Sequence, residues 1–79
     1  MDDVAQRLLA VFQDVFDDDD LEISDEMVAG DVEGWDSLKH IKLVVAIERA
    51  FSVKFKNREI SSWENVGDMR RAVAAKLGS

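Results

Sequence analysis

Ser37 is the residue of this sequence whose type and surroundings best suit covalent chemistry. It lies in the run 34–38, GWDSL, ahead of a helical pattern that continues to about Phe51. Asp36 before it is a favourable N-cap residue, because its carboxylate can accept hydrogen bonds from the unpaired amides of the first turn. Those amides and the helix dipole favour an anion at this end of the helix. The hydroxyl of Ser37 is therefore well placed to carry a phosphate ester.

Few residues are suited to catalysis or to metal binding. The sequence has no cysteine, so a thiolate metal site is impossible. His40 is the only histidine, so no second histidine is available as a base for a serine nucleophile. Positions 17–20 are all aspartate, but the alternating ligand spacing and turn glycine of an EF-hand loop are missing. A solvated acidic turn is the better interpretation. We expect no catalytic residue and no metal site.

His40 itself has two interpretations. It follows Ser37 by three residues and lies within about 60° of it around a helix, so its imidazole could approach a phosphodiester on Ser37. The same angle brings it near the core face, where it would line the top of a helical bundle. The second interpretation is preferred, and it gives His40 no catalytic role.

Three further helices are predicted around the one that begins at Ser37. The first covers about 3–16, where apolar residues recur at helical spacing behind a cap at Asp2 or Asp3. A short helix is predicted from Arg58 to about Ser62, with Asn57 as its cap and Ile60 buried.

The last helix is predicted to follow Asn65 as its cap, with Asp68 at the third position in a relative of the capping box. Its apolar stripe would consist of Val66, Met69, Val73 and Leu77. The fold class is therefore an all-α, small four-helix bundle: three main helices and a short third one. Residues 1–79 form one domain.

The segment 21–35 has no sustained period and is predicted to be a long loop between the first two helices. Ser24 to Met27 could form one short helical turn, and Gly30 and Gly34 supply bends. The residues expected to anchor the loop on the bundle are apolar: Leu21, Ile23, Met27, Val32 and Trp35.

The helix after Ser37 has apolar residues on two sides. One side should form the core, and consists of Leu43, Val44, Ile47, Ala50 and Phe51. Phe51 and Ile47 are expected to pack against residues of the first and last helices, namely Leu8, Phe12, Met69 and Val73. The other side, bordered by charge, consists of Leu38, Ile41, Val45, Lys42, Glu48 and Arg49. Because so small a bundle cannot bury both sides, the second should stay exposed and contact partner proteins.

Composition excludes several function classes. The net charge of −7 argues against binding of nucleic acid or anionic lipid by bulk electrostatics. Residues 1–36 hold 13 acids and one base, whereas residues 37–79 hold 4 acids and 9 bases, so the second half can present a basic surface. No apolar run reaches membrane-spanning length, and the acidic first residues lack a signal-peptide pattern, so we expect a cytoplasmic protein. We also expect a monomer. From Met1 to Gly78-Ser79 the chain resembles a free-standing protein.

The triplet Asp36-Ser37-Leu38, with the length of the chain and the order of its helices, resembles the acyl carrier proteins. Members of this family carry 4′-phosphopantetheine on the motif serine and hold acyl groups as thioesters on its thiol. The resemblance implies this cofactor on Ser37, with Asp36 as part of the motif and Leu38 as the leucine that partners touch. Implied partners are a phosphopantetheinyl transferase that uses coenzyme A, and acyl-loading, acyl-transfer and condensing enzymes. It also implies a loop joining two nearly parallel helices.

The charges after Ser37 depart from those of fatty-acid carriers, whose corresponding helix is strongly acidic. Here the helix carries three basic residues and one acid, namely Lys39, Lys42, Arg49 and Glu48. This pattern looks more like free-standing carriers of polyketide and other specialised acyl-transfer pathways. The Trp35-Asp36-Ser37 triplet is also similar to D-alanyl carriers, so an aminoacyl cargo stays open. The alternative from another class is a helical adaptor whose Ser37 is unmodified or carries a simple phosphate.

Overall fold

Three long helices build the framework that presents Ser37. In the computed structural model, which describes residues 3–78, these are α1 (Asp3–Val15), α2 (Ser37–Phe51) and α4 (Val66–Gly78). A short helix α3 (Asn57–Ser61) and a 3-10 turn η1 (Ala29–Asp31) lie in the connections. No strand occurs between residues 3 and 78, and the predicted all-α fold with a long loop between α1 and α2 is confirmed.

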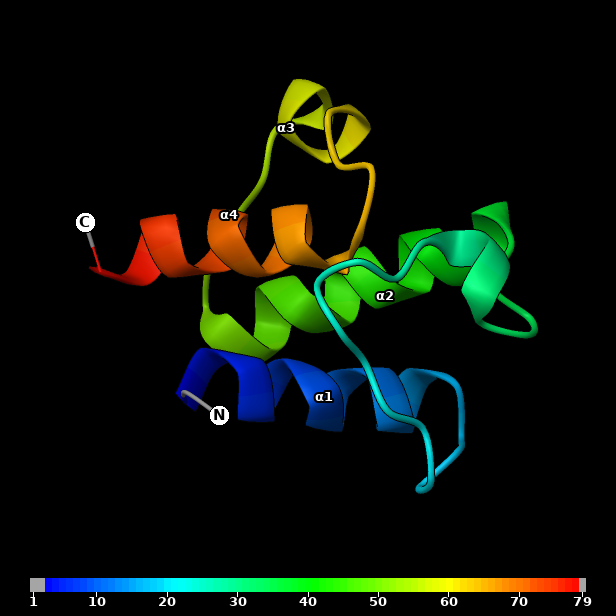
Figure 1. Cartoon of the computed structure of the whole chain (residues 1–79). Coiled ribbons are helices and arrows are strands. Elements are labelled where there is room, and N and C mark those ends of the chain that lie inside the picture. Colours follow the sequence, from blue (N-terminus) through cyan, green and yellow to red (C-terminus); the bar gives the residue numbers. More distant parts are fainter. Residues whose placement is uncertain (1–2, 79) are drawn as a thin grey trace.

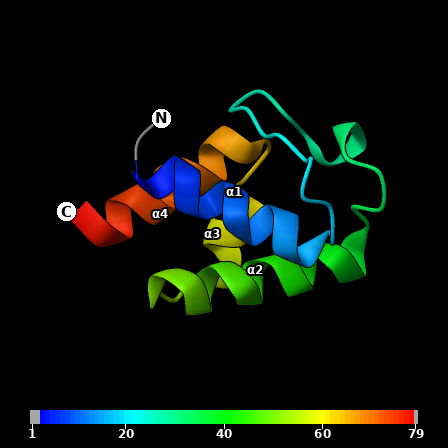
Figure 2. The same ribbon diagram turned by 90° about the horizontal axis from the view of Figure 1, so that it is seen from below.

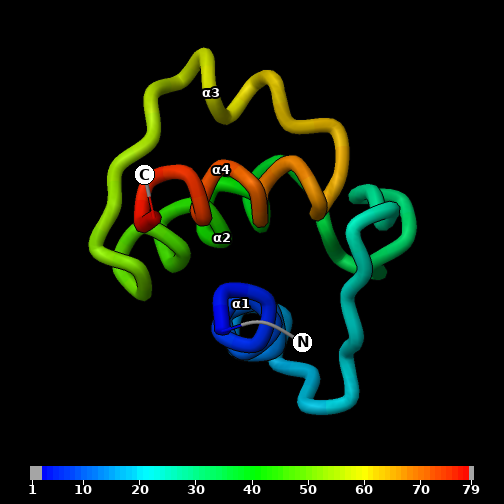
Figure 3. The backbone as a smooth tube through the Cα atoms, turned by 60° about the vertical axis from the view of Figure 1, so that its left-hand side comes forward, coloured from blue at the N-terminus to red at the C-terminus, as the bar shows by residue number. Residues whose placement is uncertain are grey.

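The direction of α2 differs from the expectation. α1 runs antiparallel to both α2 and α4, so the idea of nearly parallel first and second helices is wrong (Figure 1). Seen along α1, the helices α2 and α4 lie together on one side of it, and the loop closes a further side of the bundle (Figure 3). On its way to α2 the loop passes the N-terminal end of α4, to which it is hydrogen-bonded.

The apolar stripes of the three long helices meet in one core. As predicted, Phe51 and Ile47 share it with residues of α1 and α4. The buried cluster consists of Leu8, Phe12, Leu43, Ile47, Phe51, Phe55, Val66, Met69 and Val73. Val44 is buried as well, and Ile60 of α3 is half-buried against the cluster.

Two residues assigned to the core are exposed instead. Ala50 lies at the margin of α2, where the guanidinium of Arg7 reaches across from α1 and donates to the Ala50 carbonyl at 2.7 Å. Leu77 is 44% exposed, because the last turn of α4 extends beyond the ends of α1 and α2 (Figure 2). At Leu77, helical periodicity therefore continues past the point where a neighbouring helix can cover it.

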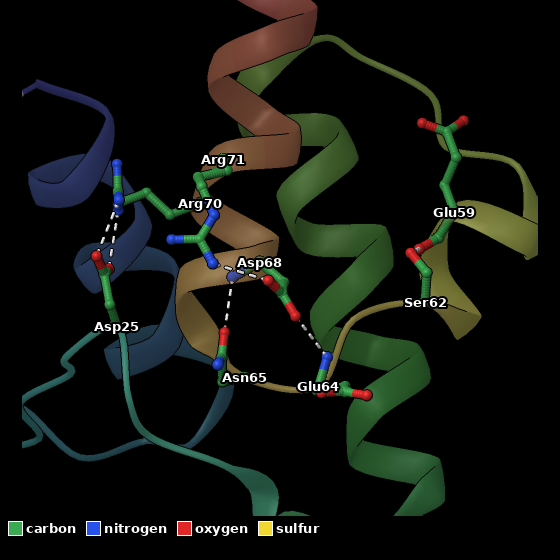
Figure 4. Close-up of polar contacts among 8 residues, drawn as sticks. All are labelled: Asp25, Glu59, Ser62, Glu64, Asn65, Asp68, Arg70 and Arg71. Atoms are coloured by element: carbon green, nitrogen blue, oxygen red, sulfur yellow. Dashed lines mark hydrogen bonds and ion pairs between the residues drawn. The ribbon is translucent and has the colours of Figure 1, made fainter.

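Side-chain caps fix the beginnings of the helices. The carboxylate of Asp36 accepts from the Lys39 amide at 2.8 Å, as predicted for the start of α2. Asn65 Oδ1 likewise accepts from the Asp68 amide at 2.8 Å before α4 (Figure 4). The cap predicted for α3 is wrong: Asn57 is already helical, and the carboxylate of Glu59 closes this turn by accepting from the Lys56 amide at 3.0 Å. Asp3 is the first residue of α1, and Asp2 lies outside the described residues.

The long loop is fastened to the N-terminal turn of α4 by what we call the loop clamp, formed by residues 25, 27, 66, 67 and 70. The amides of Val66 and Gly67 donate to the carbonyls of Met27 and Asp25, both at 2.9 Å. The Arg70 guanidinium donates two hydrogen bonds, of 2.8 and 2.9 Å, to the Asp25 carboxylate (Figure 4). These bonds lower the pKa of the Asp25 carboxyl, mainly through the Arg70 guanidinium.

Within the loop, the turn predicted at Ser24 is present, because the Met27 amide donates to the Ser24 carbonyl at 3.2 Å. The helical hydrogen bonding occurs slightly later, in η1. Gly34 bends the chain with a φ of +86°, which suits glycine, whereas Gly30 lies inside η1 and needs no such conformation. The last segment of the loop thereby brings Trp35 and Asp36 to the start of α2.

Candidate functional site

Ser37 is the first residue of α2 and its side chain is exposed. The preceding Asp36 is extended, and it turns the chain into the helix while its carboxylate caps the Lys39 amide. The first amides of an α-helix have no partner within the helix, so those of Ser37 and Leu38 remain available for an anion bound beside the hydroxyl. Ser37 thus presents its hydroxyl at the first position of the helix.

A shallow cleft of about 500 Å³ opens beside Ser37. Its walls come from the end of the loop and the first turns of α2. They are formed by Ala29, Trp35, Asp36, Ser37, His40 and Ile41. A flexible arm attached to Ser37 would have both solvent and an apolar wall within reach from its first atoms.

Trp35 holds the loop end of this cleft in place. Its indole packs edge-on against Phe12 of α1 and against Phe16, which follows α1 directly, with ring centroids 5.5 and 5.9 Å away. On the other side its indole N–H donates to His40 Nδ1 at 3.1 Å, and the two ring planes are nearly parallel, with centroids 6.0 Å apart. His40 is half-buried and lines the top of the bundle, as the preferred interpretation predicts.

The second apolar side of α2 is exposed, as expected. Leu38 is 65% exposed, Ile41 61% and Val45 41%. Lys42 and Arg49 are exposed at its border. A second surface cleft, of about 510 Å³, lies between α1 and α2. It is lined by residues 14, 41, 42, 45, 46 and 49.

Two charged residues of α2 are engaged inside the molecule. Lys39 points towards α1, with Nζ 3.5 Å from the Val15 carbonyl and 5.9 Å from the centroid of the Phe16 ring. The Glu48 carboxylate accepts from the Phe55 amide at 2.9 Å and so supports the turn after α2. The helical angle from which Glu48 is predicted to lie on the partner side does not reveal this bond to a backbone amide seven residues ahead.

The described residues contain no group of histidine, cysteine and acidic side chains arranged to hold a metal ion. Of the helices within residues 3–78, none is long and apolar enough to cross a membrane. At Ser37 the structure offers a single hydroxyl at the start of a helix, beside an open cleft. This arrangement fits the attachment of a group that brings its own reactive atom.

Comparison with known proteins agrees with this geometry. Residues 6–73 match the family model described as a phosphopantetheine attachment site. The structure resembles the holo acyl carrier protein of Geobacter metallireducens with a TM-score of 0.88 and 38% identity, over 94% of this chain and 85% of that one. It also resembles a provisionally assigned acyl carrier protein of Mycobacterium tuberculosis with a TM-score of 0.81 and 28% identity, over 91% of this chain and 96% of the other. A search of curated proteins found no match.

Acyl carrier proteins are not enzymes. They work with a phosphopantetheinyl transferase, which loads the arm, and with acyl-processing enzymes, which use its thiol. A family match over residues 6–73 and a carrier fold spanning nearly the whole chain leave little room for another assignment. The chain belongs to the phosphopantetheine-binding family as an acyl carrier protein, a non-catalytic carrier with covalently attached 4′-phosphopantetheine.

Proposed function

We propose that Ser37 is the residue that carries 4′-phosphopantetheine. The observation behind this proposal is the exposed Ser37 hydroxyl on the first residue of α2, next to amides that are free to face a phosphate. Attachment joins Ser37 Oγ to the phosphorus of the arm, the pyrophosphate P–O bond of coenzyme A breaks, and adenosine 3′,5′-bisphosphate and the hydroxyl proton leave. Asp36 contributes by fixing the start of the helix, which holds Oγ in one place for the transferase.

The arm would supply the thiol on which acyl groups are held as thioesters. The protein itself supplies the attachment point and a surface that partner enzymes recognise. Because a tether raises the local concentration of the acyl group at each partner, weak and rapidly reversible docking is sufficient. Residues 1–79 would act as one domain, as a monomer in the cytoplasm.

We further propose a docking face on α2, defined by Leu38, Ile41, Val45, Lys42 and Arg49. The exposed apolar residues supply its centre, next to Ser37, and the two cations its border. Since the Glu48 carboxylate is engaged by the Phe55 amide, we leave Glu48 out of this face. A partner that fits it has an apolar groove with acidic or neutral edges.

The basic border also supports a specialised pathway, such as polyketide biosynthesis, over fatty-acid synthesis. Fatty-acid carriers dock through an acidic helix onto basic enzymes, and here the free charges of α2 are Lys42 and Arg49. Enzymes with basic docking patches would be repelled by them, so the cognate enzymes of this carrier should differ in charge.

The attachment is tested by incubating the protein with coenzyme A and a broad-specificity phosphopantetheinyl transferase, followed by intact-mass measurement. We expect the mass to increase by one phosphopantetheine. Ser37→Ala should abolish the increase while circular dichroism stays unchanged. Ser24→Ala, a matched change at an exposed serine of the loop, should leave the increase intact. An unmodified protein across several transferases would favour the adaptor alternative instead.

A further inference from the structure

The two ring nitrogens of His40 have different surroundings. Nδ1 accepts a hydrogen bond of 3.1 Å from the indole N–H of Trp35. Because an indole N–H can only donate, Nδ1 must offer a lone pair, and the proton of the neutral imidazole is then on Nε2. Trp35 therefore sets the tautomer of His40 and turns Nε2 into a donor.

This donor is not used within the protein. Among residues 3–78, no group hydrogen-bonds to Nε2. Nor is any buried side-chain nitrogen or oxygen of these residues left without a partner, so Nε2 of the half-buried His40 reaches solvent. The ring is also held in orientation, because the hydrogen bond from Trp35 keeps its plane nearly parallel to that of the indole, with an angle of 19° between them. The result is a preset N–H donor at the surface.

His40 and Ser37 line the same cleft, about 500 Å³ in volume. They are three residues apart on α2, and side chains at this spacing are neighbours on a helix surface. The cations near Ser37 in sequence are directed elsewhere: Lys39 lies over α1, and Lys42 lines the other cleft with Asp14. Apart from the backbone amides of the first turn, His40 is the donor best placed to meet a group on Ser37.

We propose that His40 is a positioning residue for the arm, whose Nε2–H donates a hydrogen bond to the phosphodiester on Ser37. This inference rests on the proposed attachment at Ser37. The phosphate is the first part of the arm after Oγ, carries a negative charge and has oxygens that accept strongly from N–H donors. Trp35 acts through His40 by presenting the correct nitrogen. The contact directs the start of the arm along the cleft wall formed by Trp35 and Ile41.

The first test compares the wild-type apo and holo proteins by NMR. Long-range proton–nitrogen correlation should show the Nε2–H tautomer of His40 in both forms. After attachment, exchange of the Nε2 proton with water should slow at least about tenfold, which corresponds to ~1.4 kcal/mol of hydrogen bonding. An unchanged exchange rate in a protein whose mass shows complete attachment would overturn the role of His40.

The second test separates positioning from packing. His40→Gln places an amide N–H near the position of Nε2. His40→Asn places an amide oxygen near Nδ1, as the acceptor for Trp35, and its NH2 group near the position of Cδ2, so that no donor is left at the position of Nε2. In the holo variants, the phosphorus chemical shift of the phosphodiester should stay near the wild-type value for His40→Gln. In His40→Asn, the phosphorus chemical shift should move to the value measured for His40→Ala.

The opposite order, with His40→Asn matching the wild type, would show that His40 serves only Trp35 and would refute the proposal. Intact mass distinguishes this failure from failure of the proposed function. If no phosphopantetheine is found on the wild type, attachment at Ser37 is wrong and the role of His40 falls with it. If the arm is attached and the phosphorus signal is indifferent to all three changes, only the role of His40 is wrong.

Discussion

At the scale of single residues, the site depends on two different roles at the start of α2: Asp36 caps the helix and Ser37 offers the hydroxyl. Ser37 contributes an exposed hydroxyl, and the Asp36 carboxylate accepts from the Lys39 amide at 2.8 Å. Both roles follow from residue type and position, because an aspartate before a helical pattern is a cap signal. The partners of His40, Lys39 and Glu48 do not follow in this way, since each is set by a group on another element or in a turn.

The capping role of Asp36 predicts a specific pair of results. Asp36→Ala should lower the free energy of unfolding by about 1 kcal/mol, whereas Asp36→Asn, which still offers an oxygen to the Lys39 amide, should cost much less. Urea denaturation measures both. Equal losses for the two variants would mean that the charge of Asp36 matters and its cap does not. Comparing their modification rates then shows whether the transferase needs a carboxylate or only an ordered helix start.

At the scale of elements, periodicity predicts the three long helices to within about one residue, but not how the loop is held. Asp25 and Arg70 are 45 residues apart in sequence, and nothing local pairs them. Gly67 looks like an unremarkable glycine in the first turn of α4, yet the Asp25 carbonyl approaches its amide at 2.9 Å. Long-range contacts of this kind require the antiparallel course of α1, which local patterns do not contain.

The loop clamp predicts that Gly67 cannot be enlarged. A Cβ at this position would lie 2.9 Å from Asp25 Cβ and 3.0 Å from the Asp25 carbonyl oxygen, so the loop would have to move. Gly67→Ala should therefore destabilise the protein by about 1–3 kcal/mol, despite the better helix propensity of alanine. Gly30→Ala is the matched control, because a Cβ there meets nothing within 4 Å. Thermal unfolding that ranks the two variants in reverse would refute the close approach.

At the scale of the whole molecule, one core of modest size supports the docking face and the attachment site together. Phe51→Ala should cost about 3–5 kcal/mol, because the ring is buried and belongs to the cluster. That is a large share of the stability of so small a domain. Leu77→Ala, at the exposed end of α4, should cost less than about 1 kcal/mol. Chemical denaturation giving similar losses for both would mean that α2 is oriented differently.

The charge of the docking face predicts how the molecule selects partners. Lys42→Glu with Arg49→Glu should reduce acyl transfer by the cognate enzyme about tenfold, ~1.4 kcal/mol, with the effect shrinking as salt rises. Docking to basic enzymes of fatty-acid-synthase type should improve. Val45→Asp should do more damage at any salt concentration, since it puts a charge in the apolar centre.

The matched control for this pair is Lys54→Glu with Arg58→Glu, which makes the same change of net charge at exposed positions outside α2. It should leave cognate transfer near the wild-type rate. If the two double variants behave alike in low salt, total charge governs encounter and the face on α2 has no special part in it.

The central claim is that the phosphopantetheine arm is attached to Ser37, and fragment mapping of the modified protein by tandem mass spectrometry tests it most directly. The chain has six serines, at positions 24, 37, 52, 61, 62 and 79, so the measurement has real alternatives to choose among. We predict a single phosphopantetheine, found only on the fragment that contains Ser37 and lost in Ser37→Ala. An arm on any other serine, or an increase in mass that survives Ser37→Ala, would contradict the account.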